Sequence, residues 1–128
     1  MKEVTAAIII KGHRVLIAQR APGENLAGKW ELPGGKIESG ETPQECLKRE
    51  IREELDVDIE VLDFFAESIY AYHNGTIKLM AFRCKWISGE FTLKVHSHIA
   101  WVKHNELDSY DFAPADIPFV EKIKSVMS

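Results

Sequence analysis

The stretch from Gly34 to Val57 places a glycine turn directly before a helix with an unusual density of carboxylates. At about 100° per residue, Glu50, Glu53 and Glu54 fall on one face of that helix. Like charges at this spacing repel each other by roughly 0.2–0.5 kcal/mol per pair in an exposed helix. A divalent cation would remove the repulsion, and Mg²⁺ prefers carboxylate and carbonyl oxygens. The stretch therefore predicts a magnesium site and chemistry on phosphate groups.

The start of the helix is marked by Thr42, Pro43 and Glu45. A Thr N-cap, a Pro at the first helical position and a Glu three residues after the cap form a capping box. The apolar positions that would dock the helix are Cys46, Leu47, Ile51 and Leu55. Asp56 is expected to end the helix.

Strand patterns flank the helix on both sides. Apolar, β-branched or alternating runs predict strands over residues 4–10, 14–19, 59–72, 76–86 and 99–102, with a short extended piece over 30–32. His73-Asn74-Gly75 is a hairpin turn, and Pro33-Gly34-Gly35 is expected to be a sharp turn. Residues 105–107 predict a helical turn. Residues 114–127 predict a C-terminal helix, with Ile117, Val120, Ile123 and Val126 at helical spacing. The elements indicate a mixed sheet with at least two helices, of the α+β or α/β class.

The 128 residues predict one domain spanning 1–128. A net charge of −4 argues against stable binding to nucleic acid or to an anionic membrane, which needs a basic face. It permits a small anionic substrate if metal ions supply positive charge. Cys46 and Cys84 form no CxxC pattern and are expected to be reduced, buried thiols. No apolar run is long enough to span a membrane, so a cytoplasmic protein is expected.

The charged stretch follows a fixed spacing. Its specified positions are Gly35, Glu41, Arg49, Glu50, Ile51, Glu53, Glu54, Asp56 and Val57. This spacing resembles the Nudix box, GX5EX7REUXEEXGU with U apolar, at every specified position except Asp56, where the family has Gly. Asp tolerates a left-handed backbone better than most residues. The departure is therefore expected to affect stability slightly and chemistry little.

The resemblance extends over nearly the whole chain and is closest to the MutT type. It is carried by Gln19-Arg20, by segment 30–36 and by segment 112–116, which reads FAPAD. The resemblance implies the Nudix fold, an α/β/α sandwich with a mixed sheet and a loop–helix–loop catalytic motif. It also implies hydrolysis of a nucleoside triphosphate to the monophosphate and diphosphate, with Mg²⁺ or Mn²⁺. Removal of unwanted nucleotides, with 8-oxo-dGTP as the lead substrate, is the favoured function.

Alternatives stay open at this point. CTP, dCTP or 5-methyl-dCTP is the second substrate class, followed by a nucleotide sugar or a dinucleotide. A Nudix-fold binding module without catalysis is disfavoured, because such modules lose box glutamates that this chain keeps. The partner is expected to be a small nucleotide, and the chain a monomer or a homodimer.

By resemblance, Glu50, Glu53 and Glu54 bind metal together with the carbonyl of Gly34. Either Glu50 or Glu53 takes the proton from the attacking water, and the number of metal ions is open. Arg49 holds a carboxylate in place through a charge-assisted hydrogen bond, or simply pairs along the helix with a Glu four residues away.

Arg20 and Lys36 are candidate phosphate contacts, although a solvated surface role fits each of them alone. Relatives often carry an acidic residue in the loop before the last strand, and Val95 stands at that position here. His96 and His98, which would share a strand face, are possible substitutes. Two ordinary exposed histidines are the favoured interpretation.

Base recognition is expected from Asp116, with Leu32 beside it. In similar MutT proteins an Asn at this position reads the base. An ionised Asp only accepts hydrogen bonds, which favours cytosine N4 or the guanine N1/N2 edge, whereas a protonated Asp mimics Asn. The alternative is that Asp116 caps the C-terminal helix. Further candidate walls of a base pocket are Tyr70, Tyr72 and Phe82.

Overall fold

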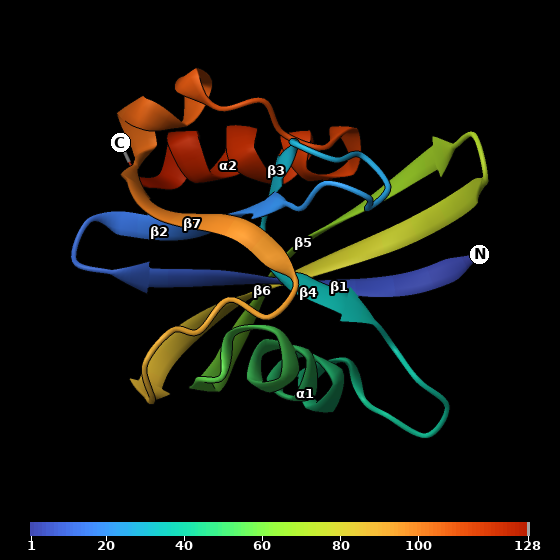
Figure 1. Cartoon of the computed structure of the whole chain (residues 1–128), viewed down its shortest axis with the longest axis horizontal. Helices are drawn as coiled ribbons and strands as arrows, with labels where there is room; N and C mark the ends of the chain where they lie inside the picture. The colour runs from blue at the N-terminus through green and yellow to red at the C-terminus, as the bar shows by residue number, and fades with distance from the viewer. Residues whose placement is uncertain (128) are drawn as a thin grey trace.

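The computed structural model describes residues 1–127 as a mixed sheet between two helical layers (Figure 1). The strands are β1 (Lys2–Lys11), β2 (Arg14–Arg20), β3 (Trp30–Glu31), β4 (Gly34–Lys36), β5 (Asp58–Tyr72), β6 (Gly75–Ser88) and β7 (His96–Lys103). The helices are α1 (Pro43–Leu55) and α2 (Ile117–Met127), with 3-10 turns η1 (His104–Ser109) and η2 (Pro114–Asp116). The predicted α/β/α sandwich is confirmed. None of the helices within residues 1–127 has the length and apolarity needed to cross a membrane.

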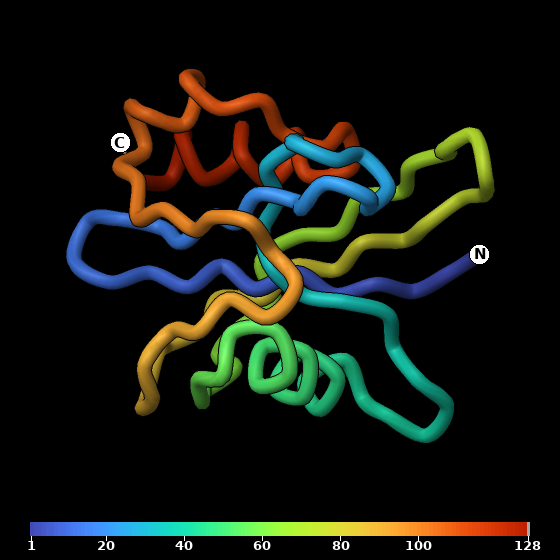
Figure 2. The backbone as a smooth tube through the Cα atoms, viewed as in Figure 1, coloured from blue at the N-terminus to red at the C-terminus, as the bar shows by residue number. Residues whose placement is uncertain are grey.

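β1 organises the sheet because it pairs with three other strands. It runs parallel to β6 and antiparallel to β2 and β4. The strand is buried on both faces, as its continuous apolar run indicates. Its first residues lie beside the turn between β5 and β6, where Lys2 is opposite Ile77 (Figure 2).

Successive residues of β1 supply two separate cores. Ile8 packs in the core under α2 with Phe119, whereas Ile9 packs in the core under α1 with Ile51. Such alternation is expected because neighbouring strand residues point to opposite faces of a sheet. The two helices therefore cover opposite faces, with α1 presenting its polar side away from the core.

The predicted boundaries of α1 are confirmed. Thr42 Oγ1 accepts a hydrogen bond from the Glu45 backbone N–H at 3.1 Å, and Glu45 Oε1 accepts from Thr42 N–H at 2.9 Å. Asp56 caps the C-terminal end in the left-handed conformation, with φ 60° and ψ 33°. The position where the box normally has Gly thus keeps its backbone geometry.

The turn predicted at Pro33-Gly34-Gly35 is wrong. Gly34 and Gly35 belong to β4 and pair with β1. A Cβ built on Gly34 would lie 2.1 Å from the Thr5 carbonyl oxygen, so glycine serves close strand approach there rather than a turn.

The largest further differences from the predicted boundaries are at β7 and at the C-terminal helix. β7 begins at His96 rather than at residue 99, and the C-terminal helix is divided into η2 and α2. Ile117 and Val126 are exposed, and the buried face is formed by Phe119, Val120 and Ile123. A spacing of three residues rotates by about 60° per step away from a fixed helix face, so a run at that spacing cannot stay buried.

Candidate active site

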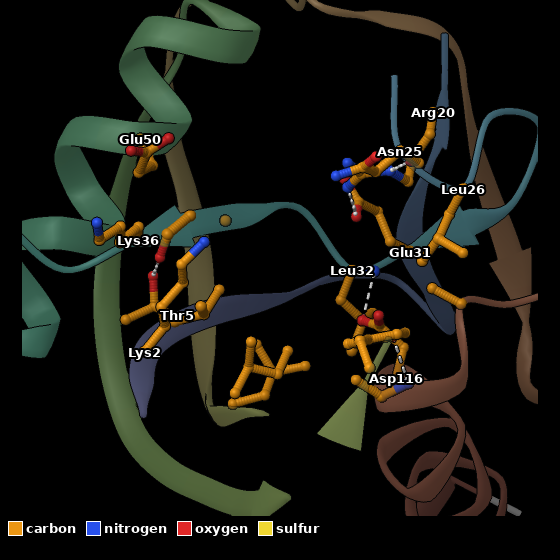
Figure 3. Close-up of a pocket in the computed structure, with 18 of the residues that line it drawn as sticks. Lys2, Thr5, Arg20, Asn25, Leu26, Glu31, Leu32, Lys36, Glu50 and Asp116 are labelled. Carbon is orange, nitrogen blue, oxygen red and sulfur yellow. Dashed lines mark hydrogen bonds and ion pairs between the residues drawn. The ribbon is translucent and has the colours of Figure 1, made fainter. Parts of the chain in front are cut away.

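A cavity of about 630 Å³ runs from α1 to η2 across the end of β1. Glu50 lies at one end and Asp116 at the other, with Arg20 and Lys36 on facing walls (Figure 3). The cavity thus brings together most of the residues that the sequence pattern singled out.

At the α1 end, Glu50 and Glu54 line the cavity together with Gly34 and Gly35. A Cβ on Gly35 would lie 2.3 Å from Glu50 Cδ, so Gly at this position leaves room for the Glu50 side chain. Glu54 Oε1 is buried and has no hydrogen-bond partner among the described residues. Burial, followed by the charge of Glu50, raises the pKa of Glu54 to about 9.

These residues fit a divalent cation. An unpartnered buried carboxylate oxygen is costly unless a cation or a proton compensates for it. Glu50, Glu54 and the Gly34 carbonyl form an all-oxygen donor set of the kind that Mg²⁺ and Mn²⁺ accept. Within residues 1–127 no three His, Cys, Asp or Glu side chains are already gathered into a metal cluster.

Arg49 organises the carboxylates of the helix. Its guanidinium binds Glu41 through Nε at 2.6 Å and Nη2 at 3.0 Å, and its Nη1 donates to Glu50 at 2.9 Å and to Glu53 at 2.8 Å. The hydrogen bond from Arg49 lowers the pKa of Glu41 to about 2. Glu41 also accepts from the Glu38 backbone N–H at 2.9 Å, so its carboxylate ties the loop before α1 to Arg49. Both interpretations of Arg49 hold, because one of its partners is Glu53 four residues on.

Glu53 differs from its two neighbours. Its side chain is 56% exposed, against 17% for Glu50, and it does not line the cavity. Glu50 and Glu54 are four residues apart and share a helix face, whereas Glu53 is rotated toward solvent. Metal binding through all three glutamates would require the Glu53 side chain to turn toward the cavity.

Arg20 and Lys36 both line the cavity. Arg20 donates from Nη1 to Glu31 Oε1 at 2.8 Å and from Nε to the Asn25 carbonyl at 2.5 Å. Burial alone would lower the pKa of Arg20, but the Glu31 carboxylate outweighs it and raises that pKa. Lys2 also lines the cavity and was not singled out by the sequence, because no motif marks the first residues of β1.

At the η2 end, Asp116 is 5% exposed and its Oδ1 accepts from the Leu32 backbone N–H at 3.1 Å. Burial, followed by the charge of Glu31, raises the pKa of Asp116 well above its ordinary value. The side chain binds Leu32 rather than capping α2, so the capping alternative is wrong. The Tyr72 hydroxyl accepts from the Ala115 backbone N–H at 2.9 Å and holds η2 against β5.

Of the candidate pocket walls, Leu32 and Tyr72 line the cavity, whereas Tyr70 and Phe82 do not. Phe82 packs in the core under α1, on the opposite face of the sheet. Its placement there follows from strand alternation, which the sequence pattern alone could not assign to a face.

The two histidines have different environments. His98 is exposed and its Nδ1 contacts Gln19 Oε1 at 3.0 Å. His96 is 8% exposed and its Nε2 contacts Glu31 Oε2 at 2.8 Å. The expectation of two exposed histidines is wrong for His96, because a register shift between Gln19 and Arg20 changes the strand pairing. Neither histidine lines the nucleotide-sized cavity.

Comparison with known proteins agrees with this geometry. The chain is 42% identical over 116 residues to a protein named putative 8-oxo-dGTP diphosphatase 2 from Mycobacterium tuberculosis, covering 88% of this chain and 81% of that protein. It is 38% identical over 123 residues to the CTP pyrophosphohydrolase of Escherichia coli, covering 94% and 90%. The solution structure of the MutT protein from methicillin-resistant Staphylococcus aureus 252 superposes with a TM-score of 0.78 at 40% identity, covering 98% and 96%. The profile of the NUDIX domain matches residues 1–123, and the chain belongs to this family.

Proposed function

We propose that this chain hydrolyses nucleoside triphosphates to the monophosphate and diphosphate. The observation that carries the proposal is the single cavity that joins the Glu50 and Glu54 carboxylates to the buried Asp116. A triphosphate at the α1 end places its base at the η2 end. Relatives named 8-oxo-dGTP diphosphatase and CTP pyrophosphohydrolase support the same reaction.

Glu50, Glu54 and the Gly34 carbonyl would hold Mg²⁺ or Mn²⁺, and Glu53 is the further ligand that the resemblance predicts. The bound cation supplies screening of phosphate charge and activation of water. Arg49 keeps Glu50 oriented toward the cavity through a 2.9 Å hydrogen bond. Arg20 and Lys36 bind phosphate oxygens from facing walls. Glu50 or Glu53 accepts the proton from the attacking water.

Asp116 selects the base as a neutral acid. One of its oxygens is occupied by the Leu32 N–H, and the protonated carboxyl adds one O–H donor. A donor beside an acceptor matches O6 and N1–H of guanine, an edge that 8-oxoguanine keeps, and 8-oxo-dGTP is the lead substrate because a relative named for it matches most of the chain. The same pair matches N3 and N4–H of cytosine, which makes CTP, dCTP or 5-methyl-dCTP the second candidate. A role in cleaning the nucleotide pool agrees with the expected cytoplasmic location.

The decisive experiment incubates the purified protein with Mg²⁺ and a panel of 8-oxo-dGTP, the common triphosphates, 5-methyl-dCTP, a nucleotide sugar and a dinucleotide. Monophosphate and diphosphate are the expected products, measured by chromatography, and EDTA is expected to abolish them. Turnover confined to the nucleotide sugar or the dinucleotide, or the absence of diphosphate with every triphosphate, would refute the proposal.

A further inference from the structure

Three side chains outside the Nudix box form a buried chain of contacts. The Glu31 carboxylate accepts from Arg20 Nη1 through Oε1 at 2.8 Å and contacts His96 Nε2 through Oε2 at 2.8 Å. The His96 side chain is 4% exposed and that of Glu31 16%. We propose that Glu31 and His96 form a brace that positions Arg20 for the nucleotide, which makes both of them positioning residues for the reaction. The inference rests on the proposed function.

The brace joins three strands that are distant in sequence. Arg20 ends β2, Glu31 ends β3 and His96 begins β7. The register shift between Gln19 and Arg20 pairs Gln19 with His98 and Arg20 with His96. Ser97 is then the extra residue on β7, and such irregularities re-aim side chains at the end of a strand pair. The irregular pairing therefore places His96 beside the carboxylate that holds Arg20.

The hydrogen-bond roles follow from the chemistry of the partners. The Glu31 carboxylate, which is paired with Arg20, only accepts hydrogen bonds, so His96 Nε2 is the donor. Both Glu31 oxygens are then engaged by donors on opposite sides, which fixes the carboxylate and with it the guanidinium. A second hydrogen bond, from Arg20 Nε to the Asn25 carbonyl, fixes the other side of the guanidinium.

The third guanidinium nitrogen of Arg20, Nη2, is available to a ligand. Arg20 Nη2 donates to no residue within 1–127, although Arg20 lines the main cavity. The guanidinium lies beside Glu31 and Asn25, across the cavity from Glu50 and Lys36 (Figure 3). A held guanidinium loses less side-chain entropy when the nucleotide binds, so the brace lowers the free-energy cost of binding.

A smaller cavity of about 150 Å³ lies behind the brace. It is lined by Arg20, Glu31, Glu54 and His96 among others. His96 Nδ1 is buried without a partner among the described residues, as is Glu54 Oε1. Within residues 1–127 the contact with Glu31 is therefore the side-chain hydrogen bond that orients the His96 ring.

The test compares variants at two histidines of the same strand. His96→Leu removes the donor and is expected to raise KM for the best triphosphate about tenfold, the size of one charge-assisted hydrogen bond, with kcat changed less than about threefold. His96→Gln keeps an amide N–H at similar reach and is expected to stay within about threefold of the natural protein in KM. His98→Leu is the matched control, because His98 is exposed and its ring hydrogen-bonds, within residues 1–127, to Gln19 and Ser97 alone, so the KM of this variant should not change.

A double-mutant cycle with Arg20→Gln separates positioning from general stability. Once Arg20 is gone, His96→Leu should raise KM no further, since His96 acts only through Arg20. The variants should rank in the same order by their Kd for the nucleotide as by KM. The Kd is measured by titration in EDTA, where turnover stops. Equal, additive effects in both backgrounds, or a His96→Leu variant with unchanged KM, would overturn the inference.

Two controls keep the outcome interpretable. Glu31→Gln preserves side-chain shape but weakens both hydrogen bonds, so it should reproduce the KM increase even if His96→Leu does not fold. A natural protein without triphosphate turnover would refute the proposed function. Normal turnover with unresponsive His96 and Glu31 variants would refute only the brace.

Discussion

The two ends of the cavity are built in different ways. At the α1 end, called the metal end after its proposed role, Glu50, Glu54 and Gly34 come from one continuous stretch, and Arg49 neutralises the carboxylates around it. At the η2 end, called the base end after its proposed role, Leu32 and Asp116 are 84 residues apart and meet through one hydrogen bond of 3.1 Å. The metal end is thus local in sequence, and the base end exists only after folding.

The pKa values of two carboxyl groups, one on Glu41 and one on Asp116, are shifted in opposite directions. Glu41, hydrogen-bonded to Arg49, has its pKa lowered to about 2 and stays ionised. Asp116, buried without a cationic hydrogen-bond partner, has its pKa raised and is suited to remain neutral. The two residues show that a cationic partner lowers the pKa of a carboxyl group whereas burial raises it, and the buried Glu54 follows Asp116 rather than Glu41 in this respect.

The largest expected effect is at the metal end. Glu54→Gln removes the buried anion that a cation would neutralise, and kcat should fall about 1,000-fold, which corresponds to several kcal/mol of transition-state stabilisation. Steady-state hydrolysis of the best triphosphate measures this loss. Glu50→Gln and Glu53→Gln should be measured in the same assay. The variant that loses kcat but keeps its affinity for Mn²⁺ identifies the general base. Glu60→Gln, an exposed Glu on β5, is the control, and a kcat near normal for Glu54→Gln would remove Glu54 from the mechanism.

The second effect is at the base end. Asp116→Ala removes the hydrogen bonds to the base, and kcat/KM should fall about 100-fold, because sites built to hydrogen-bond a substrate depend strongly on that group. Asp116→Asn offers the donor and acceptor of a neutral acid and should stay within about tenfold. Only the natural protein should lose kcat/KM as pH rises through the raised pKa of Asp116, since ionisation removes its donor. An Asn variant as inactive as the Ala variant would show that the ionised form reads the base.

A third, smaller effect concerns stability without metal. Because the pKa of Glu54 is raised to about 9 in the folded chain, the unfolded chain binds fewer protons than the folded one between pH 4.5 and 9. The contribution of Glu54 to stability is therefore fully present below its ordinary pKa and is lost as pH rises toward 9. Asp116 acts in the same direction.

Urea unfolding in EDTA at pH 5 and pH 8 measures this contribution. Glu54→Gln should be more stable than the natural protein at pH 8 by about 1–3 kcal/mol, the cost of an unsatisfied buried polar group, and nearly equal to it at pH 5. Mg²⁺ should stabilise the natural protein and leave the variant unchanged. A difference that is the same at both pH values would contradict the raised pKa.

The smallest effect is at the end of α1. Asp56 adopts φ 60°, and Asp56→Gly should stabilise the chain by about 0.5–1 kcal/mol because Gly carries no Cβ penalty there. The exposed Arg52–Asp56 ion pair, at 3.9 Å, contributes little and its loss should not offset the gain. Thermal unfolding measures the change, and kcat should be unaltered. A fall in kcat would connect the helix cap to the metal end.

The sequence by itself determined the catalytic helix. The capping box from Thr42 to Glu45 and the apolar spacing of the helix are local, so its ends and its carboxylate face could be predicted from neighbouring residues alone. The same local spacing led to the family and to the α/β/α layers. The sequence predicts less well which face of the sheet a strand residue occupies and how deeply it is buried. For this reason the sequence pattern placed Phe82 at the pocket and Gly34 in a turn.

Only the tertiary structure decided the base end and the brace. Whether Asp116 is neutral depends on its burial beside Leu32 and Glu31, and no pattern around residue 116 encodes that environment. The pairing of Glu31 with His96 depends on strand register, which a shift of one residue would abolish. Helix periodicity is a short-range property of the chain, whereas burial and register arise from contacts between distant segments, and these contacts place Asp116 beside Leu32 and His96 beside Glu31.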